Sequence, residues 1–273
     1  MANFSLINTS EQIPDAVKDL EQHSVLSLDC EGVFLSRKGL LCIVQLGTPT
    51  GHVYLFDIIV LCGEPFEKGL KRILESSSIV KIIHDCRRDS DALFHQFGVR
   101  LGNVFDTQVA DIWIRKNYKM AMPKYVNSYV KLLAYYLDES VIDLTDKNAG
   151  TELLKRDNDV WLKRPLDPSL IGYAVTDVIH LHSLKKAMEA RMFRELTNGM
   201  ECYLACDRDK NETPEKPPAK PPLNPDDFEF IADHLKKTLR ISGPSLPKNY
   251  SQRGAECMKD LFQFNSGRRF KKL

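Results

Sequence analysis

Three separate stretches of the chain carry side chains that could do chemistry together: Asp29, Glu31, Asp89, Tyr173 and Asp177. The first two end an apolar run, Val25–Glu31 (VLSLDCE). If this run is a β-strand, Asp29 and Glu31 lie on one face because alternate side chains point the same way. Two carboxylates placed so could form half of a metal site. They could equally be a charged strand end entering a turn at Gly32. This stretch alone does not distinguish between a metal site and a strand end.

The remaining three residues lie where helices are expected. Asp89 follows a strand-like run and precedes an apolar helical pattern, which places it near a helix start. Its neighbours Asp85 and Asp91 are weaker alternatives. Tyr173 and Asp177 are four residues apart, so on a helix they share a face and a phenol would lie beside a carboxylate.

The elements that would position these residues follow an α/β pattern. We expect strands at Phe4–Asn8, Val25–Glu31, Leu40–Gly47, His52–Ile58 and Ile79–His84, and helices from Ser10, at Glu67–Glu75, at Asp89–Phe97, near Tyr129–Leu137 and from Asp167 to about Arg191. Three consecutive strands with short links predict a meander with mixed strand pairing. Asp167 is the expected N-cap of the last helix, with Pro168 in its first turn. The pattern between Arg115 and Lys163 is looser.

Composition sets limits on the class of protein. The 273 residues are 43% hydrophobic, which is enough for a large core, and 38 basic residues against 37 acidic ones give a net charge of +1. Overall charge therefore argues neither for nor against a nucleic acid partner. We expect a soluble cytoplasmic or nuclear protein, because the sequence shows no signal peptide and no run near the roughly 18 apolar residues of a membrane span. The seven cysteines show no C-x-x-C pair, which indicates free thiols.

Composition changes after about residue 207. We predict a first domain at 1–207, a Pro-rich linker at 208–225 and a C-terminal extension at 226–273. The extension has one amphipathic pattern, Asp226–Leu239, and a basic tail, Arg268–Lys272. The tail could add nucleic acid affinity or be only a solubilising or localisation signal. The predicted helix could dock on the first domain or on a partner protein.

The motifs LDCEG, KIIHDCRRDSDALFHQFGVRLGNVFDTQVAD and WLKRPLDPSLIGYAVTD resemble the three exonuclease motifs of the ribonuclease D-like 3′-to-5′ exonucleases. These enzymes use four acidic residues and a tyrosine. The resemblance runs from about Phe4 to Arg191 and implies a ribonuclease H-like mixed β-sheet flanked by helices. The related branch that uses histidine would need it at position 172, which is a glycine here. Some shorter segments, such as NVFDTQVAD, also resemble the exonuclease 3′-5′ domain-containing protein 1 group, which is linked to small-RNA silencing.

The resemblance implies an activity and a cofactor. Four carboxylates could hold two Mg²⁺ or Mn²⁺ ions about 3.5 to 4 Å apart, an arrangement suited to phosphodiester hydrolysis. By analogy Asp29 would bridge both ions, Glu31 and Asp177 would complete the first, Asp89 would serve the second, and Tyr173 would orient the attacking water. The substrate would be a single-stranded 3′ end, RNA rather than DNA, releasing nucleoside monophosphates. The alternative is a catalytically silent RNA-binding adaptor of a silencing complex, because members of that group can lack catalytic acids.

Weaker candidates for substrate contacts surround these motifs: Phe34, His84, Arg87, Arg88 and Arg164. Phe34 could stack on a terminal base or pack in the core. His84 could touch a phosphate or the terminal nucleotide, or be purely structural. The two adjacent arginines could steer a phosphate backbone or form a solvated helix start. Asp106 and Asp57 are expected to be a helix cap and a strand end. The sequence leaves the oligomeric state open.

Overall fold

The computed structural model describes residues 3–119, 123–138, 142–194, 196–198, 200, 201 and 204. The chain divides into two compact units, Met1–Arg194 and Glu195–Leu273, and the strands and helices below lie in the first unit. The Pro-rich linker, the helix predicted at Asp226–Leu239 and the basic tail lie outside the described residues. The predicted boundary at residue 207 stays a prediction.

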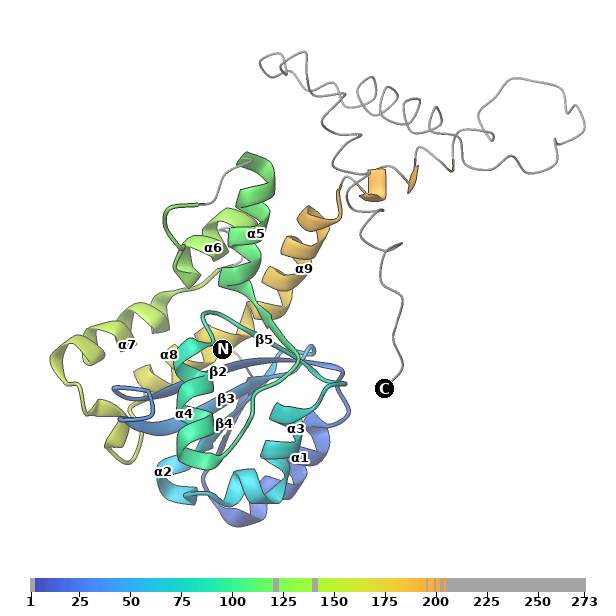
Figure 1. Ribbon diagram of the computed structural model, residues 1–273. Coiled ribbons are helices and arrows are strands. Elements are labelled where there is room, and N and C mark those ends of the chain that lie inside the picture. The colour runs from blue at the N-terminus through green and yellow to red at the C-terminus, as the bar shows by residue number, and fades with distance from the viewer. Residues whose placement is uncertain are drawn as a thin grey trace, which may run out of the picture. The chain divides into compact units, whose positions relative to one another are not determined.

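A six-stranded mixed sheet forms the centre of the first unit (Figure 1). Its strands are β1 (Asn3–Ile7), β2 (Val25–Val33), β3 (Leu40–Gly47), β4 (His52–Asp57), β5 (Val80–Ile83) and β6 (Val104–Asp106). They lie in the order β1-β4-β3-β2-β5-β6. Strands β2, β3 and β4 pair antiparallel, whereas β1 pairs parallel with β4, β5 with β2 and β6 with β5. The predicted meander with mixed pairing is therefore confirmed.

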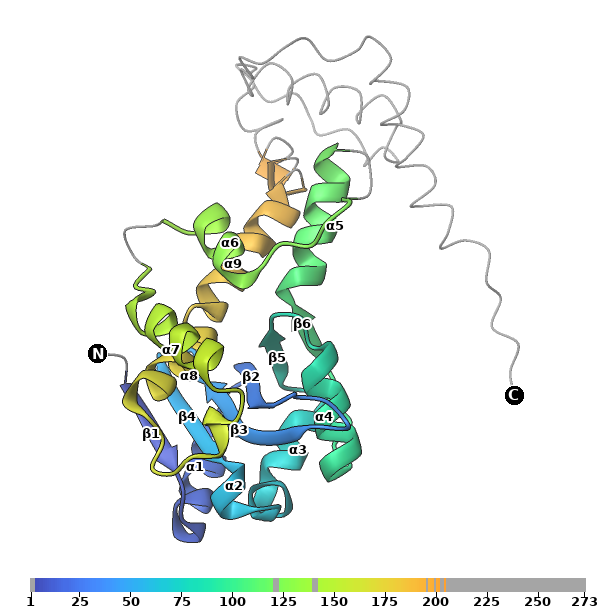
Figure 2. The same cartoon turned by 90° about the vertical axis from the view of Figure 1, so that its left-hand side faces the viewer.

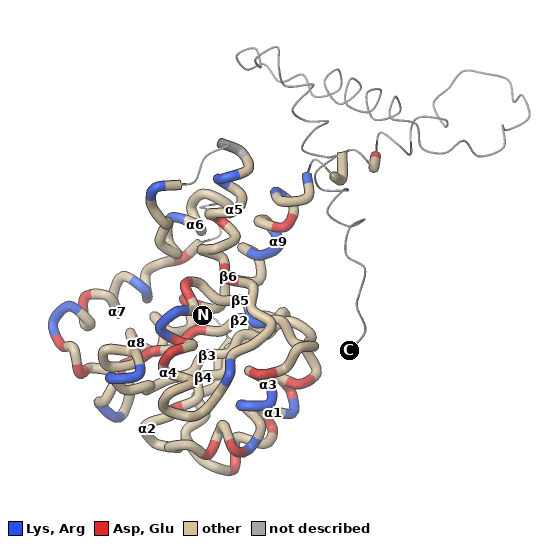
Figure 3. The backbone as a smooth tube through the Cα atoms, viewed as in Figure 1, with Lys and Arg blue, Asp and Glu red and all other residues tan. Residues whose placement is uncertain are grey.

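Helices cover both faces of this sheet. They are α1 (Ile13–Leu20), α2 (Ile58–Leu61), α3 (Lys71–Glu75), α4 (Arg87–Phe97), α5 (Thr107–Lys119), α6 (Tyr129–Tyr136), α7 (Thr145–Arg156), α8 (Pro168–Ile179) and α9 (Leu181–Met192). One hydrophobic cluster joins the sheet to α1, α3 and α4, and a second joins its other face to α5, α6, α8 and α9. Helices α5 and α9 run side by side (Figures 1 and 2). Basic and acidic positions are interspersed over the described elements (Figure 3).

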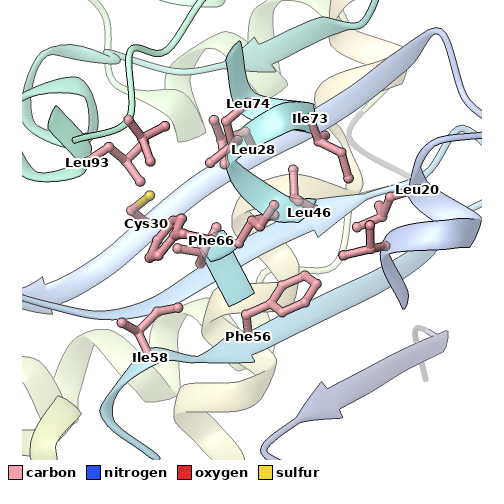
Figure 4. Close-up of a cluster of buried hydrophobic side chains, with 14 of the residues drawn as sticks. Leu20, Leu28, Cys30, Leu46, Phe56, Ile58, Phe66, Ile73, Leu74 and Leu93 are labelled. Carbon is pink, nitrogen blue, oxygen red and sulfur yellow. The ribbon is translucent and has the colours of Figure 1, made fainter. Parts of the chain in front are cut away.

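The alternation of side chains along β2 determines which of its residues are buried in the hydrophobic core. Leu28 and Cys30 enter the first cluster, where Figure 4 shows Cys30 close to Leu93 of α4. Asp29 and Glu31 must therefore face the other side of the sheet, where α8 packs. Strand β3 is buried through most of its length because both faces are covered, which explains its nearly continuous apolar sequence.

Two expectations about helices need correction, and one helix was not expected. The helix expected from Asp167 to Arg191 is two helices, α8 and α9, with a break at His180. The helix expected at Glu67–Glu75 begins as a π-helical turn at Phe66–Leu70, where Gly69 has a φ of 131°. Helix α7 falls in the stretch whose pattern was too loose to assign, because it buries only Gly150 fully.

Two further sequence expectations concern the described part of the chain. Cys30, Cys42, Cys62 and Cys86 are free thiols, as predicted. Each helix in the described ranges is too short or too polar to cross a lipid bilayer.

Candidate active site

Strand β2 and helix α8 bring three carboxylates together on one side of the sheet. One oxygen each of Asp29, Glu31 and Asp177 lies within 4.8 Å of the other two. The pairing of β2 with β3 shifts between Glu31 and Gly32, which is a bulge next to the site. A Cβ atom on Gly32 would lie 1.9 Å from the carbonyl oxygen of Leu40, so only glycine fits there. The bulge thus shifts the register of β2 against β3 directly after the two carboxylates.

Asp89 approaches the same cavity from the first turn of α4. Its side chain is buried, and its Oδ1 atom has no hydrogen-bond partner within the described ranges. The preceding loop is held by Asp106, whose two carboxylate oxygens accept the backbone N–H of Asp85 (3.2 Å) and of Cys86 (2.9 Å). An unpaired buried carboxylate oxygen is costly, so this atom is a candidate ligand for a cation.

Helix α8 presents Tyr173 and Asp177 one turn apart, as predicted. Asp167 caps this helix by accepting the N–H of Ser169 over 2.8 Å, which confirms its predicted role. All five predicted side chains line one cavity, which is bounded by Asp29, Cys30, Glu31, Leu35, His84, Asp89, Tyr129, Lys147, Tyr173 and Asp177.

Burial and mutual repulsion make this cluster electrostatically expensive without a cation. Burial first, and then the charges of Asp89, Asp177 and Glu31, hold the pKa of Asp29 well above its usual value. Burial raises the pKa of Glu31 as well, followed by the charge of Asp177. Burial also raises the pKa of Asp89 to about 6, although hydrogen bonds from its own backbone and from Cys30 act in the opposite direction. Carboxylates crowded in this way are stabilised by a bound cation.

The donor set fits hard divalent ions. Asp29, Glu31 and Asp177 offer carboxylate oxygens close enough to share one ion, and Asp89 adds a buried oxygen that has no hydrogen-bond partner in the described part of the chain. Oxygen ligands of this kind suit Mg²⁺ and Mn²⁺ rather than zinc. Burial and then the charges of Glu31 and Asp177 raise the pKa of Tyr173, so its phenol stays protonated at neutral pH.

Lys147 is a site residue that the sequence reasoning missed. It comes from α7, and its ammonium group donates a hydrogen bond to Oδ1 of Asp177. The same nitrogen lies over the ring of Tyr173, 4.1 Å from its centroid. No motif marks this lysine in the sequence, and the helix that carries it lacks a strong apolar pattern. Its place in the cavity depends on how α7 packs against α8.

His84, at the end of β5, lines the cavity in a defined tautomer. Its Nδ1 lies 3.0 Å from Oγ1 of Thr107, and that hydroxyl already donates its hydrogen to the carbonyl of Ile83. Nδ1 must therefore carry the proton and donate to Thr107. Burial lowers the pKa of His84, which favours the neutral ring. Its Nε2, which no described residue contacts by a hydrogen bond, is then an acceptor.

The other substrate candidates lie outside the residues that line the cavity. Phe34 is 74% exposed with a φ of 49°, so the alternative of core packing is wrong for it. Arg87 and Arg88 are exposed at the start of α4, where Arg87 pairs with Asp85 at 2.5 Å. Arg164 makes two hydrogen bonds to Asp57, each of 2.5 Å, and Asp57 also caps α2. The guanidinium of Arg164 is therefore engaged in holding the fold together.

The neighbouring acids have structural roles, and the weaker alternatives Asp85 and Asp91 do not line the cavity. Asp91 pairs with Arg37 at 2.7 Å, and Asp85 pairs with Arg87. Asp106 accepts the N–H of Gln108 over 2.8 Å at the start of α5, which makes it a helix cap as predicted. Asp89 is thus the acid of this segment that enters the cavity.

A family model described as 3′-5′ exonuclease matches residues 4–192, most of the chain. The chain belongs to this 3′-5′ exonuclease family. Apart from Asn3 of β1, the matched residues contain all the strands and helices described above and every side chain that lines the cavity. The resemblance to ribonuclease D-like exonucleases is therefore confirmed, and with it the α/β class with a mixed sheet flanked by helices.

Curated relatives within the 3′-5′ exonuclease family include the piRNA biogenesis proteins EXD1. The human protein is 35% identical over 206 residues, which cover 74% of this chain and 39% of the relative. The silkworm (Bombyx mori) protein is 35% identical over 193 residues, which cover 70% of this chain and 58% of the relative. The chain thus spans about two fifths to three fifths of the length of these relatives.

Solved structures show the same fold. Ribonuclease D of Trypanosoma brucei in complex with RNA U12 superimposes with a TM-score of 0.57 at 23% identity, covering 84% of this chain and 79% of that one. At 23% identity this similarity shows that the fold is shared, and it gives no information about the substrate of this chain.

Proposed function

We propose that this protein is a metal-dependent 3′-to-5′ exonuclease that hydrolyses phosphodiester bonds at the 3′ end of single-stranded nucleic acid. The substrate in this proposal is RNA in preference to DNA, and the products are nucleoside monophosphates. The observation that carries the proposal is the convergence of Asp29, Glu31, Asp89, Tyr173 and Asp177 on one cavity. An acidic cleft of this composition is of use to a nuclease because it can hold divalent cations.

The proposed ligands divide into two groups. Asp29, Glu31 and Asp177 would hold one ion, and Asp89, together with Asp29, would hold a second. When bound, such a pair supplies an activated water and charge stabilisation at the phosphorus and the leaving 3′ oxygen. The protein itself contributes the fixed placement of the ligands on β2, α4 and α8. This placement lowers the cost of ordering the reactants.

Tyr173 would orient the attacking water. Its phenol lies beside Asp177 on α8 and stays protonated, because burial and neighbouring carboxylates raise its pKa. A protonated phenol can donate or accept a hydrogen bond but is a poor general base. We therefore assign Tyr173 a positioning contact to water and not proton abstraction.

His84 supports the preference for RNA. As an acceptor at Nε2 it would repel a phosphate oxygen, which also offers only lone pairs, and would favour a hydroxyl group. A ribose offers a 2′-hydroxyl that deoxyribose lacks. The presence of RNA in the complex of the trypanosomal ribonuclease D is consistent with this preference. A cytoplasmic or nuclear location belongs to the same proposal.

A nuclease assay tests the proposal directly. The full chain is incubated with 5′-end-labelled single-stranded RNA and DNA in Mg²⁺, in Mn²⁺ or in EDTA. We expect stepwise shortening from the 3′ end that requires the metal and is lost in Asp29→Asn by at least about 100-fold. Asp91→Asn is the matched control, since Asp91 pairs with Arg37 instead of entering the cavity. No shortening by the wild type, or activity that survives in Asp29→Asn, would refute the proposal.

The similarity to piRNA biogenesis proteins favours a second candidate, an RNA-binding adaptor in a small-RNA silencing complex. In that case the cavity would hold RNA without cutting it. Residues 226–273, outside the described residues, are then the candidate contact for a protein partner. Tight RNA binding in EDTA together with no cleavage in Mn²⁺ would favour the adaptor over the exonuclease.

A further inference from the structure

Lys147 places a positive charge inside the carboxylate cluster. Its ammonium group forms an ion pair with Asp177, and the two side chains are only 14% and 9% exposed. Asp177 is also one of the three carboxylates whose oxygens converge. The charge of Lys147 opposes the rise in the pKa of both Asp177 and Glu31. One lysine therefore serves as counter-ion to more than one proposed metal ligand.

The packing of α7 on α8 fixes Lys147 in this position. A Cβ atom on Gly150 of α7 would lie 2.5 Å from Cβ of Tyr173, and one on Gly172 of α8 would lie 2.6 Å from Cγ of Asp146. The helices thus approach closely at two glycines, and Lys147 lies between these contacts in the sequence of α7. The ring of Tyr173 lies under the ammonium group at 4.1 Å, and that of Tyr129 lies at 5.7 Å. Such cation–π contacts help to hold the charge in place.

A divalent ion and this ammonium group would compete. Both need the oxygen of Asp177, and two cations so close repel each other in a poorly solvated cavity. A nucleic acid phosphate brings a negative charge to the same cavity and offers Lys147 a different partner. The lysine has a flexible stem and can exchange one oxygen for another without movement of α7.

We propose that Lys147 is the resident cation of the site, that it competes with the metal ions for Asp177, and that its transfer to a substrate phosphate couples nucleic acid binding to metal binding. This inference rests on the proposed function, because it assumes that the four carboxylates bind divalent ions. Coupling of this kind is reciprocal: a phosphate ligand that removes Lys147 from Asp177 tightens metal binding, and metal tightens phosphate binding by the same factor.

Metal titration tests the competition without any need for activity. Mn²⁺ is titrated calorimetrically into the full-length wild type, Lys147→Met, Lys147→Arg and the control Lys155→Met, whose lysine is on the same helix but pairs with Glu152. We expect Lys147→Met to bind Mn²⁺ at least about tenfold more tightly than the wild type. Lys147→Arg and Lys155→Met should bind as the wild type does. Thermal melts identify any variant that has lost its fold. If Lys147→Met has done so, Lys147→Gln, which also removes the positive charge, carries the comparison with the same expected result.

The coupling is tested by repeating the titrations with uridine 5′-monophosphate, which has no phosphodiester bond to cleave. The nucleotide should tighten Mn²⁺ binding by a larger factor in the wild type than in Lys147→Met, after correction for Mn²⁺ binding to the nucleotide alone. Equal Mn²⁺ affinities in the wild type and Lys147→Met, or equal effects of the nucleotide, would overturn the inference and leave the exonuclease proposal intact. If neither protein binds Mn²⁺, the metal site itself is refuted and both proposals fail.

Discussion

The carboxylate of Asp106, the last residue of β6, accepts the backbone N–H of Cys86 over 2.9 Å and so ties down the loop that leads to Asp89. Its other oxygen accepts the N–H groups of Asp85, Gln108 and Val109. One side chain thus caps α5 and fixes the start of α4. The position of a proposed metal ligand depends on an acid that does not line the cavity itself.

Asp106→Ala should therefore weaken both stability and metal binding. We expect the free energy of unfolding, from urea titrations, to fall by about 2 kcal/mol, because a helix cap and loop hydrogen bonds are lost together. Mn²⁺ affinity should fall as well, because Asp89 loses its fixed position. Asp106→Asn keeps one acceptor oxygen and should show a smaller loss of both. Reduced stability with unchanged Mn²⁺ affinity would show that Asp106 only stabilises the fold.

Tyr173→Phe should separate catalysis from stability. The phenol oxygen has no hydrogen-bond partner among the described residues, so its removal should change the free energy of unfolding by less than about 0.5 kcal/mol. We expect kcat to fall about 10- to 100-fold, because the attacking water loses its orienting contact. Single-turnover cleavage of labelled RNA measures the effect, with the exposed Tyr125→Phe as control. A variant with wild-type kcat would remove Tyr173 from the mechanism.

The raised pKa of Asp89, about 6, predicts how the stability of the metal-free protein changes with pH. Between about pH 4 and 6 the folded state binds more protons at this carboxyl than the unfolded state does. The free energy of unfolding should therefore decrease as the pH rises through this range. Urea titrations in EDTA at pH 4, 5, 6 and 7 should show a shallower decrease for Asp89→Asn. Identical pH profiles would mean that Asp89 ionises normally in the fold.

Metal should reverse this pH dependence. Mn²⁺ binds deprotonated carboxylates, so its affinity should fall as the pH is lowered from 7 to 5. At saturating Mn²⁺ the free energy of unfolding at pH 7 should exceed the value in EDTA, because the ligand binds only the folded state. The same urea titrations with Mn²⁺ check both expectations.

His84→Phe should reduce the preference for RNA. Loss of one hydrogen bond from a ribose hydroxyl to Nε2 is expected to lower the ratio of kcat/KM for RNA over DNA about three- to tenfold. The comparison uses oligonucleotides of one sequence that differ only in the sugar of the 3′-terminal residue. His95→Phe, at a partly exposed histidine of α4, is the control. An unchanged ratio would leave His84 with only its contact to Thr107.

The five side chains that converge, and the strand that carries the first two, could be predicted from the sequence alone. Asp29 and Glu31 share a face because strands alternate, and Tyr173 and Asp177 share one because helices repeat every 3.6 residues. These are local periodicities that any sequence displays directly. The order of the three motifs then identified the family, which the match over residues 4–192 confirms.

Some of the other groups that line the cavity could not be predicted from the sequence, because they depend on how distant elements pack. Lys147 lies in the cavity because α7 packs against α8. Arg164 is held outside the cavity by hydrogen bonds to Asp57, which lies 107 residues away in the chain. At Gly172 a side chain would collide with Asp146, so the packing of α7 itself leaves no room for the histidine of the related branch. Such contacts join residues distant in sequence, and no local spacing encodes them. The proposed ligands of the site could be predicted from local spacing, whereas the packing of α7 on α8 places the charge of Lys147 against them.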